Sequence, residues 1–192
     1  MRVVLQRGWF VVVAIALVAG AAEARAQGPE YAGLLSPYVG LASGGDARGQ
    51  GLAGGLSVAV VDRSGWGAEA DIAHLGGLDS DRFTEVGATS FMLSAVWAAS
   101  EGRWRPFGVG GAGLIRTRAC AGGCASSVTH VDAGFNAGGG LHLAINEALL
   151  VRAEVRYLRA LRAHADLGLR DGGRLDAWRT VIGVTWTWPM IE

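Results

Sequence analysis

The stretch from Leu149 to Leu158, LLVRAEVRYL, limits most strongly what this chain can fold into. Read with a period of two, it separates into an apolar set and a charged set: Leu149, Val151, Ala153, Val155 and Tyr157 against Arg152, Glu154 and Arg156. Such alternation is typical of a β-strand whose two faces meet different surroundings. Its residues also favour helices, and four fall at helical spacing: Leu150, Ala153, Tyr157 and Leu161. The sequence of the neighbouring segments is therefore needed to distinguish a strand from a helix here.

Glycine is distributed in a way that favours a strongly curved sheet. The 192 residues include 31 glycines, about twice the usual share of 7%. They lie inside apolar runs such as PFGVGGAGL and FNAGGGLHL and do not form a linker. Glycine inside a strand marks close backbone approach or sharp curvature, which a small barrel needs. The composition therefore favours one all-β domain.

The N-terminus has the features of an export signal. They are a positive start with Arg2 and Arg7, an apolar stretch over 9–19 and the small-x-small sequence Ala24-Arg25-Ala26. The apolar stretch is shorter than the roughly 20 residues that a membrane-spanning helix needs. We expect residues 1–26 to be a signal peptide that is cleaved after Ala26.

The sequence that remains after cleavage limits the cellular locations that the protein can have. No later run approaches 18 unbroken apolar residues, so we expect no transmembrane helix. This leaves a periplasmic protein, a secreted protein or an outer-membrane barrel. Removing residues 1–26 leaves 14 basic and 16 acidic side chains, and this net charge of −2 argues against a nucleic-acid partner.

Eight segments have the pattern of strands, with turn residues between them. They are Tyr38–Ser43, Leu52–Asp62, Trp66–His74, Glu85–Ala98, Trp104–Thr117, Val131–Ile145, Leu149–Arg159 and Trp178–Trp188. The connections after the second, fourth and sixth are brief, and the others are longer and glycine-rich or charged. Alternating tight turns and wide loops are typical of an outer-membrane barrel. We predict an eight-stranded antiparallel up-and-down transmembrane barrel over 36–192, after a short segment over 27–35.

Aromatic residues gather where these strands end. One group falls at the ends with the short connections: Trp66, Trp97, Trp104, Trp186 and Trp188. A second group falls at or near the opposite ends: Phe83, Tyr157 and Trp178. A membrane barrel has aromatic girdles at both interfaces, because amphipathic rings favour the headgroup level. The two groups therefore predict a lipid-facing wall bounded by girdles.

The cost of charge in lipid fixes the register of the Leu149–Arg159 strand. An arginine that faces hydrocarbon near the midplane costs about 2–4 kcal/mol, and a glutamate costs less. Slipping this strand by one residue would expose Arg152, Glu154 and Arg156 together, at roughly 5 kcal/mol or more. We therefore expect these charges inside the barrel.

The chain resembles the small outer-membrane β-barrel domains of bacteria, including OmpX and the transmembrane part of OmpA. The resemblance covers roughly 36–188 and rests on RPFGVGGAGL, on FNAGGGLHLAI followed by LLVRAEVRYL, and on the aromatic strand VIGVTWTW. It implies an outer-membrane address and, as partners, membrane lipid or lipopolysaccharide and the barrel-assembly machinery. Family members usually end on an aromatic residue, whereas here Trp188 is followed by Pro189-Met190-Ile191-Glu192.

The lumen-facing charges are the first candidate site. With Glu69 and Asp71 from the third strand, the three charges of LLVRAEVRYL make an internal ion-pair network. The interior of an eight-stranded barrel is just wide enough for side chains to fill it. The network is then a structural core of the lumen; the functional alternative is a narrow polar conduit or binding pocket.

Three further features of the sequence have a possible function. Cys120 and Cys124 in CAGGC fit a small disulfide in an exported protein, and we expect no metal site there. His74, His130, His142 and Asp132 suggest a barrel hydrolase that acts on lipid. Ser126 and Ser127 lie upstream of His130 and Asp132, but no pattern singles out a nucleophile. The segment 160–177 mixes arginine and aspartate as a solvated loop does, and binding of anionic lipopolysaccharide is its functional alternative.

The sequence therefore favours an outer-membrane barrel that acts by structure or surface binding, with no cofactor and no catalysis. Two alternatives from other classes are a narrow pore or hydrophobic-ligand conduit, and a soluble exported β-sandwich or lipocalin-like binder. A barrel hydrolase acting on lipid is a further alternative. The sequence does not specify a ligand, an oligomeric state or a physiological role.

Overall fold

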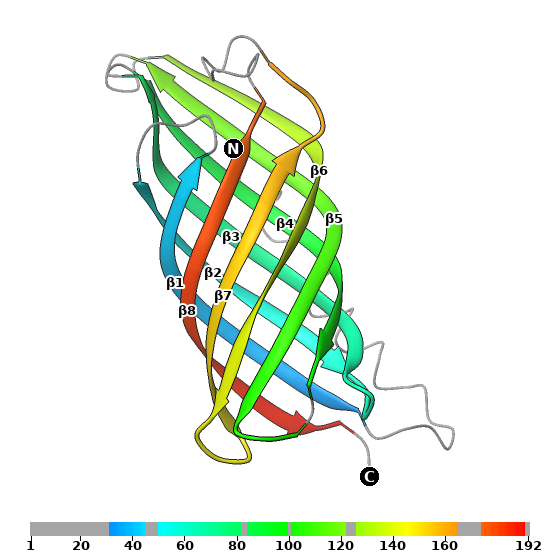
Figure 1. Ribbon diagram of the computed structural model, residues 1–192. Coiled ribbons are helices and arrows are strands. Elements are labelled where there is room, and N and C mark those ends of the chain that lie inside the picture. Colours follow the sequence, from blue (N-terminus) through cyan, green and yellow to red (C-terminus); the bar gives the residue numbers. More distant parts are fainter. Residues whose placement is uncertain are drawn as a thin grey trace, which may run out of the picture.

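The described residues form a closed barrel of antiparallel strands (Figure 1). The computed structural model describes residues 31–44, 50–81, 84–99, 101–121, 126–164 and 174–190. The strands are β1 (Ala32–Gly44), β2 (Gln50–Val61), β3 (Trp66–Asp81), β4 (Thr84–Ala98), β5 (Trp104–Ala121), β6 (Ser126–Ala144), β7 (Leu149–Ala160) and β8 (Asp176–Pro189). Each pairs with the next, and β1 pairs with β8 to close the sheet. The predicted eight-stranded up-and-down barrel is confirmed.

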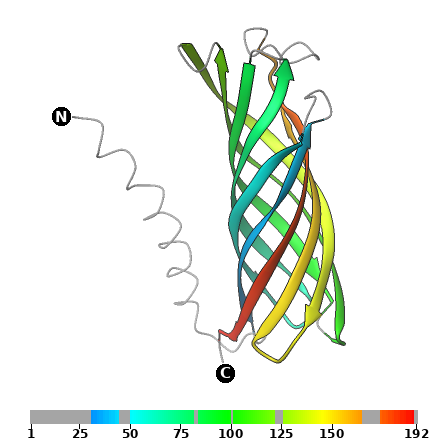
Figure 2. The same cartoon turned by 90° about the vertical axis from the view of Figure 1, so that its left-hand side faces the viewer.

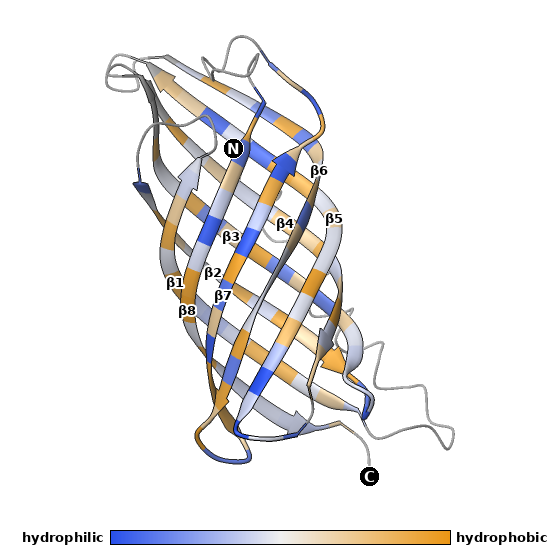
Figure 3. Cartoon of the chain, viewed as in Figure 1, coloured by the Kyte–Doolittle hydropathy of each residue, from blue (hydrophilic) through white to orange (hydrophobic). Residues whose placement is uncertain are grey.

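The two faces of β7 separate as the alternation predicts, and those of β8 separate in the same way. On β7, Arg152 and Arg156 are 2% and 0% exposed, whereas Val155 between them is 45% exposed. On β8, Val181 is buried and its neighbour Ile182 is exposed. Figure 3 shows hydrophilic and hydrophobic positions alternating along these strands. Apolar side chains therefore form the outer wall, and the charges of β7 lie in the lumen.

Short turns join the strands at the end of the barrel where the C-terminus lies (Figure 1). The turn after β2 is held by Asp62, whose carboxylate accepts the Ser64 hydroxyl at 2.6 Å and the Trp66 amide at 3.1 Å. The Ser64 hydrogen bond holds the pKa of Asp62 below its usual value. Gly65 completes the turn at a φ of 86°, and a Cβ there would lie 2.0 Å from the Ala98 carbonyl oxygen. Only glycine fits this position.

The opposite end differs from the expected alternation of short and long connections. β3 and β5 extend past the predicted ends at His74 and Thr117, and β6 begins before Val131. The connection between β3 and β4 is only residues 82–83, where a long loop was expected. The reason is that backbone pairing continues through polar residues, with bulges between β3 and β4. These strands project beyond their neighbours (Figure 2).

The barrel also begins earlier than predicted. β1 starts at Ala32, whereas the first strand was predicted from Tyr38 and the barrel domain from residue 36, because Ala32 to Leu35 pair with both β2 and β8. No helix in the described ranges is long and apolar enough to cross a membrane. The expected signal peptide and its cleavage site at Ala26 lie outside the described residues.

Candidate functional site: a charge network in the lumen

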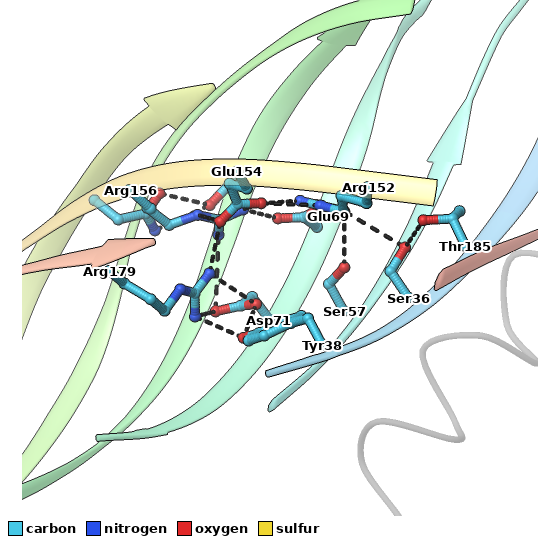
Figure 4. A network of polar contacts seen from close by, with 12 residues as sticks. Ser36, Tyr38, Ser57, Glu69, Asp71, Arg152, Glu154, Arg156, Arg179 and Thr185 are labelled. Carbon is cyan, nitrogen blue, oxygen red and sulfur yellow. Dashed lines mark hydrogen bonds and ion pairs between the residues drawn. The ribbon is translucent and has the colours of Figure 1, made fainter. Parts of the chain in front are cut away.

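Four neighbouring or facing strands deliver charged side chains to the middle of the lumen (Figure 4). β7 contributes three charges at alternate positions, β3 contributes two, and β8 and β1 contribute one polar group each. The members are Arg152, Glu154 and Arg156, then Glu69 and Asp71, then Arg179 and Tyr38. Every one is at most 3% exposed. We call this set the lumen network.

Glu154 is the hub of the lumen network. Its Oε2 accepts Nε–H of Arg152 at 3.0 Å and Nη2–H of Arg156 at 3.1 Å. Its Oε1 accepts Nη2–H of Arg179 at 2.8 Å, and Nε of Arg156 lies 2.8 Å from the same oxygen. One carboxylate therefore contacts three guanidinium groups, which explains how it remains charged in a buried position.

Glu69 and Asp71 supply the remaining negative charge from β3. Glu69 accepts Nη2–H of Arg152 at 2.9 Å with one oxygen and Nη2–H of Arg156 at 2.6 Å with the other. Asp71 accepts Nη1–H of Arg179 at 2.9 Å, and Nη1 of Arg156 lies 3.7 Å from it. Both carboxylates thus connect β3 to strands on the other side of the barrel.

Tyr38 closes the network on the β1 side. Its hydroxyl donates to Oδ2 of Asp71 at 2.6 Å and accepts Nη1–H of Arg179 at 2.6 Å. The Arg179 guanidinium also lies 4.5 Å from the centre of the Tyr38 ring. This arrangement adds a cation–π contact to the hydrogen bonds. Tyr38 therefore orients both members of the ion pair.

Arg152 connects the network to a polar layer nearer the short turns. Its Nη1 donates to Ser57 Oγ at 3.1 Å and to Ser36 Oγ at 3.5 Å. Ser36 is hydrogen-bonded to Thr185 at 2.7 Å. The guanidinium stacks 4.6 Å from the centre of the Phe107 ring. Its donors are thus distributed over carboxylates and hydroxyl groups from β1, β2, β3 and β7.

The charges of the lumen network cancel. Three arginines face three carboxylates, all buried: Arg152, Arg156 and Arg179 against Glu69, Asp71 and Glu154. Removing one partner from such a set leaves an uncompensated buried charge and costs about 3–5 kcal/mol. Every charged group of the network lies against an opposite charge, although Nε of Arg179 has no hydrogen-bond partner among the described residues. A neutral network of this kind offers no surplus charge for a ligand, and it occupies the middle of the lumen as a plug.

Apolar layers pack on both sides of this plug. Toward the projecting strands, the lumen holds a large cluster that includes Leu75, Leu78, Met92, Ile115 and Leu158. Toward the short turns, two smaller clusters contain Leu34, Ala59 and Val96, and Ala98, Phe107 and Val109. Side chains of the described residues therefore occupy the lumen on both sides of the network, as expected for a barrel of this size.

The structure brings the predicted lumen residues together in the lumen network. Two further members of the network were not predicted from the sequence. Arg179 and Tyr38 were not singled out, although Arg179 has the same parity as Val181 and Thr185, which face inward. That parity is the signal that could have found Arg179. Tyr38 gave no such signal, because a tyrosine in an apolar strand fits either face of a barrel wall.

The predicted aromatic residues lie on the outer wall in two groups. Near the short turns, Trp66, Trp97, Trp104, Trp186 and Trp188 are 38–60% exposed. We call this group the lower belt. Farther along the wall, Trp178 and Tyr157 are cross-strand partners with ring centres 5.0 Å apart, and Phe135 lies 6.2 Å from Tyr157. These three form the upper belt; the side chain of Phe83 lies outside the described residues.

The remaining candidates lie near the projecting end. Cys120 is disulfide-bonded, and Cys124 lies outside the described residues. Asp132 accepts a hydrogen bond from Nε2 of His164 at 2.9 Å. His130 stacks on His164 with ring centres 3.8 Å apart. The structure thus places His164 in contact with both His130 and Asp132.

A closed barrel with an apolar outer wall, aromatic belts and a charged, filled lumen is the architecture of a membrane-spanning β-barrel. The family described as outer membrane protein beta-barrel domain matches residues 10–187. The chain belongs to this family. Membership implies a location in the bacterial outer membrane.

Solved structures show the same fold at low sequence identity. Neisserial surface protein A (NspA) is 15% identical, with 83% of this chain and 99% of that chain covered and a TM-score of 0.62. Ail, the attachment invasion locus protein of Yersinia pestis, is 14% identical, with 84% and 100% covered and a TM-score of 0.54. The N-terminal barrel domain of Pseudomonas aeruginosa OprF is 16% identical, with 84% and 100% covered and a TM-score of 0.52. The comparison with curated proteins gave no match.

Proposed function

We propose that this protein is a sealed outer-membrane barrel that acts by structure and by surface binding, without conducting solutes and without catalysis. The observation that carries the proposal is the lumen network, with three guanidinium groups and three carboxylates engaged with one another across the barrel. A conducting pore would need an open, hydrated path. Here the network and the apolar clusters on either side of it occupy that path.

The binding role belongs to the projecting end. In outer-membrane barrels the short turns face the periplasm and the other end faces outward. The strands β3 to β6, 15–19 residues long, therefore extend a wall of sheet above the membrane, whereas the other four strands have 12–14 residues. A solved structure of Ail holds the heparin analogue sucrose octasulfate. This supports surface binding as a role compatible with the fold.

The histidine, aspartate and serine side chains of the hydrolase alternative give little support for catalysis. His164 is paired with Asp132, and His164 stacks on His130. Of the two serines upstream of His130, only Ser127 has a described side chain, and that side chain is exposed. A lipid hydrolase needs a nucleophile within hydrogen-bond reach of its base. Lipid A acylation in cells with and without the protein should therefore be the same.

Planar-bilayer recording tests the sealed lumen. The refolded full-length protein is expected to give no conductance steps, whereas a porin refolded by the same procedure gives them. A variant in which Arg152→Ala and Glu154→Ala remove the centre of the plug should conduct more than the wild type if it folds. Heat-dependent gel mobility checks folding, because a closed barrel runs as a compact form until it is boiled. Discrete channels in the wild type would overturn the proposal.

A further inference from the structure

The outer wall of β1, β2 and β3 carries an apolar groove. Its volume is about 790 Å³, and the lining includes Val39, Leu41, Leu52, Gly54, His74 and Gly76. On β2, Leu52 and Leu56 are exposed on either side of Gly54. A Cβ added at Gly54 would meet nothing nearer than the Tyr38 carbonyl oxygen at 3.8 Å. The groove is therefore open space where the wall lacks a side chain.

A row of cross-strand partners runs from this groove to a cation. Gly54 pairs with His74, His74 with Thr89, and Thr89 with Arg116. Nδ1 of His74 lies 3.0 Å from Oγ1 of Thr89. The side chains of His74, Thr89 and Arg116 are exposed on the outer wall. Arg116 is farther from the short-turn end of its strand than Gly54 is, so the row rises toward the outer surface.

The outward face of β5 changes from apolar to cationic where this row ends. Leu114 is 50% exposed, and Arg116 and Arg118 follow it on the same face. Neither arginine forms an ion pair within the described ranges. A change from aliphatic to cationic side chains is expected where acyl chains give way to headgroups. Guanidinium groups bind phosphate through paired hydrogen bonds.

We propose that this wall binds one phosphorylated, acylated lipid of the outer leaflet, the chemical class that includes lipid A. An acyl chain lies in the groove beside Gly54, and the phosphate lies at Arg116 and Arg118 with Thr89 and His74 at its side. The apolar groove and the cationic pair are separate observations. The groove suits an acyl chain and the cationic pair suits a phosphate, and one lipid molecule carries both. A neutral lipid would fill the groove but would leave both guanidinium groups without a partner.

This inference deepens the proposed function by naming a partner, and it rests on the membrane orientation given there. It does not depend on a sealed lumen. If the wild-type barrel neither binds lipid A nor conducts, this inference alone is overturned. If it binds lipid A and also conducts, the sealed lumen alone is overturned.

Native mass spectrometry of the full-length barrel in detergent tests the proposal. The probes are lipid A, dephosphorylated lipid A, phosphatidylcholine and inorganic phosphate, each titrated separately. We expect lipid A to bind as a single retained molecule and the others to bind more weakly. Arg116→Gln should weaken lipid A binding about fivefold, because one cation near a lipid headgroup contributes about that factor. Arg103→Gln, in the turn after β4, is the charge control and should change nothing.

Filling the groove tests the acyl-chain half. Gly54→Leu should weaken lipid A binding about tenfold by occupying the space of a few methylene groups. Gly108→Leu is the matched control, because Gly108 has nothing within 4 Å of an added Cβ and lies outside the groove lining. Gly76→Ala is a second, smaller filler, since its Cβ would lie 3.5 Å from the His74 ring. Gel mobility before and after boiling shows that each variant folds.

Three results would overturn the proposal. The first is equal binding of lipid A and dephosphorylated lipid A, which would show that the phosphate is not recognised. The second is equal lipid A binding by the folded Gly54→Leu and Gly108→Leu variants, which would show that the groove does not hold the acyl chain. The third is a barrel dimer that Gly54→Leu dissociates, because the groove would then hold a second copy of this chain.

Discussion

At the scale of single residues, the lumen network shows how buried charges are tolerated in a small barrel. Glu154 is 2% exposed and is held by three guanidinium groups from two strands. Each arginine in turn contacts at least two carboxylates. Because the members share partners, removing one of them affects the whole set.

Glu154→Gln should lower the free energy of unfolding by about 3–5 kcal/mol, because three buried arginines would then face two carboxylates. Urea unfolding in detergent micelles, followed by the heat-sensitive gel shift, measures the change. Glu147→Gln is the control, since Glu147 is exposed in the turn after β6. Equal unfolding midpoints for the two variants would contradict the role assigned to the hub.

At the scale of the strand, the position of each belt defines how deep an outward residue lies. Ile182 on β8 lies midway between Trp178 of the upper belt and Trp186 of the lower belt, and it is 59% exposed. Val131 on β6 lies beyond Phe135 of the upper belt and pairs with Arg116. The same substitution at these two positions therefore samples two depths of the membrane.

Ile182→Arg should destabilise the barrel in lipid vesicles by about 2–4 kcal/mol, and Val131→Arg by about 0–1 kcal/mol. The difference arises because the guanidinium at Ile182 faces hydrocarbon, whereas at Val131 it reaches the headgroups. Equilibrium unfolding in vesicles measures both values. If the two arginines cost the same, the belts do not mark the membrane interfaces.

At the scale of the whole molecule, the barrel is complete from β1 to β8 and closes by pairing β1 with β8. The strand β1 begins at Ala32, after the predicted cleavage site at Ala26. Processing at that site would leave every described strand intact. The mature protein would then start with a short segment before the barrel.

Intact mass measurement of the protein purified from outer membranes should give a chain that starts at Gln27, because signal peptidase requires the small residues Ala24 and Ala26. Ala26→Leu should block the cleavage and leave the longer precursor. Gln27→Asn, beside the same bond, is the control and should be processed normally. A mature mass that starts elsewhere would show that the cleavage site is wrong.

Much of the fold could be predicted from the sequence, because a period of two is a local property of each strand. The inward positions of Glu69, Asp71, Arg152 and Arg156 follow from it, and so does the outward position of Val155. The extension of β3, β5 and β6 could not be predicted in this way. Those segments mix glycine, polar and apolar residues without a regular period of two, and only the neighbouring strand determines whether they continue the sheet.

The sequence by itself therefore determined which face of β7 is apolar and which is charged, because a charge that faces hydrocarbon near the midplane is costly. Only the tertiary structure decided which charges meet. Glu69 and Arg152 are 83 residues apart and contact each other at 2.9 Å because the sheet closes with one register and brings β3 opposite β7. The same closure placed Arg179 and Tyr38 against Asp71, since a shift of one residue in either strand would turn them to the other face.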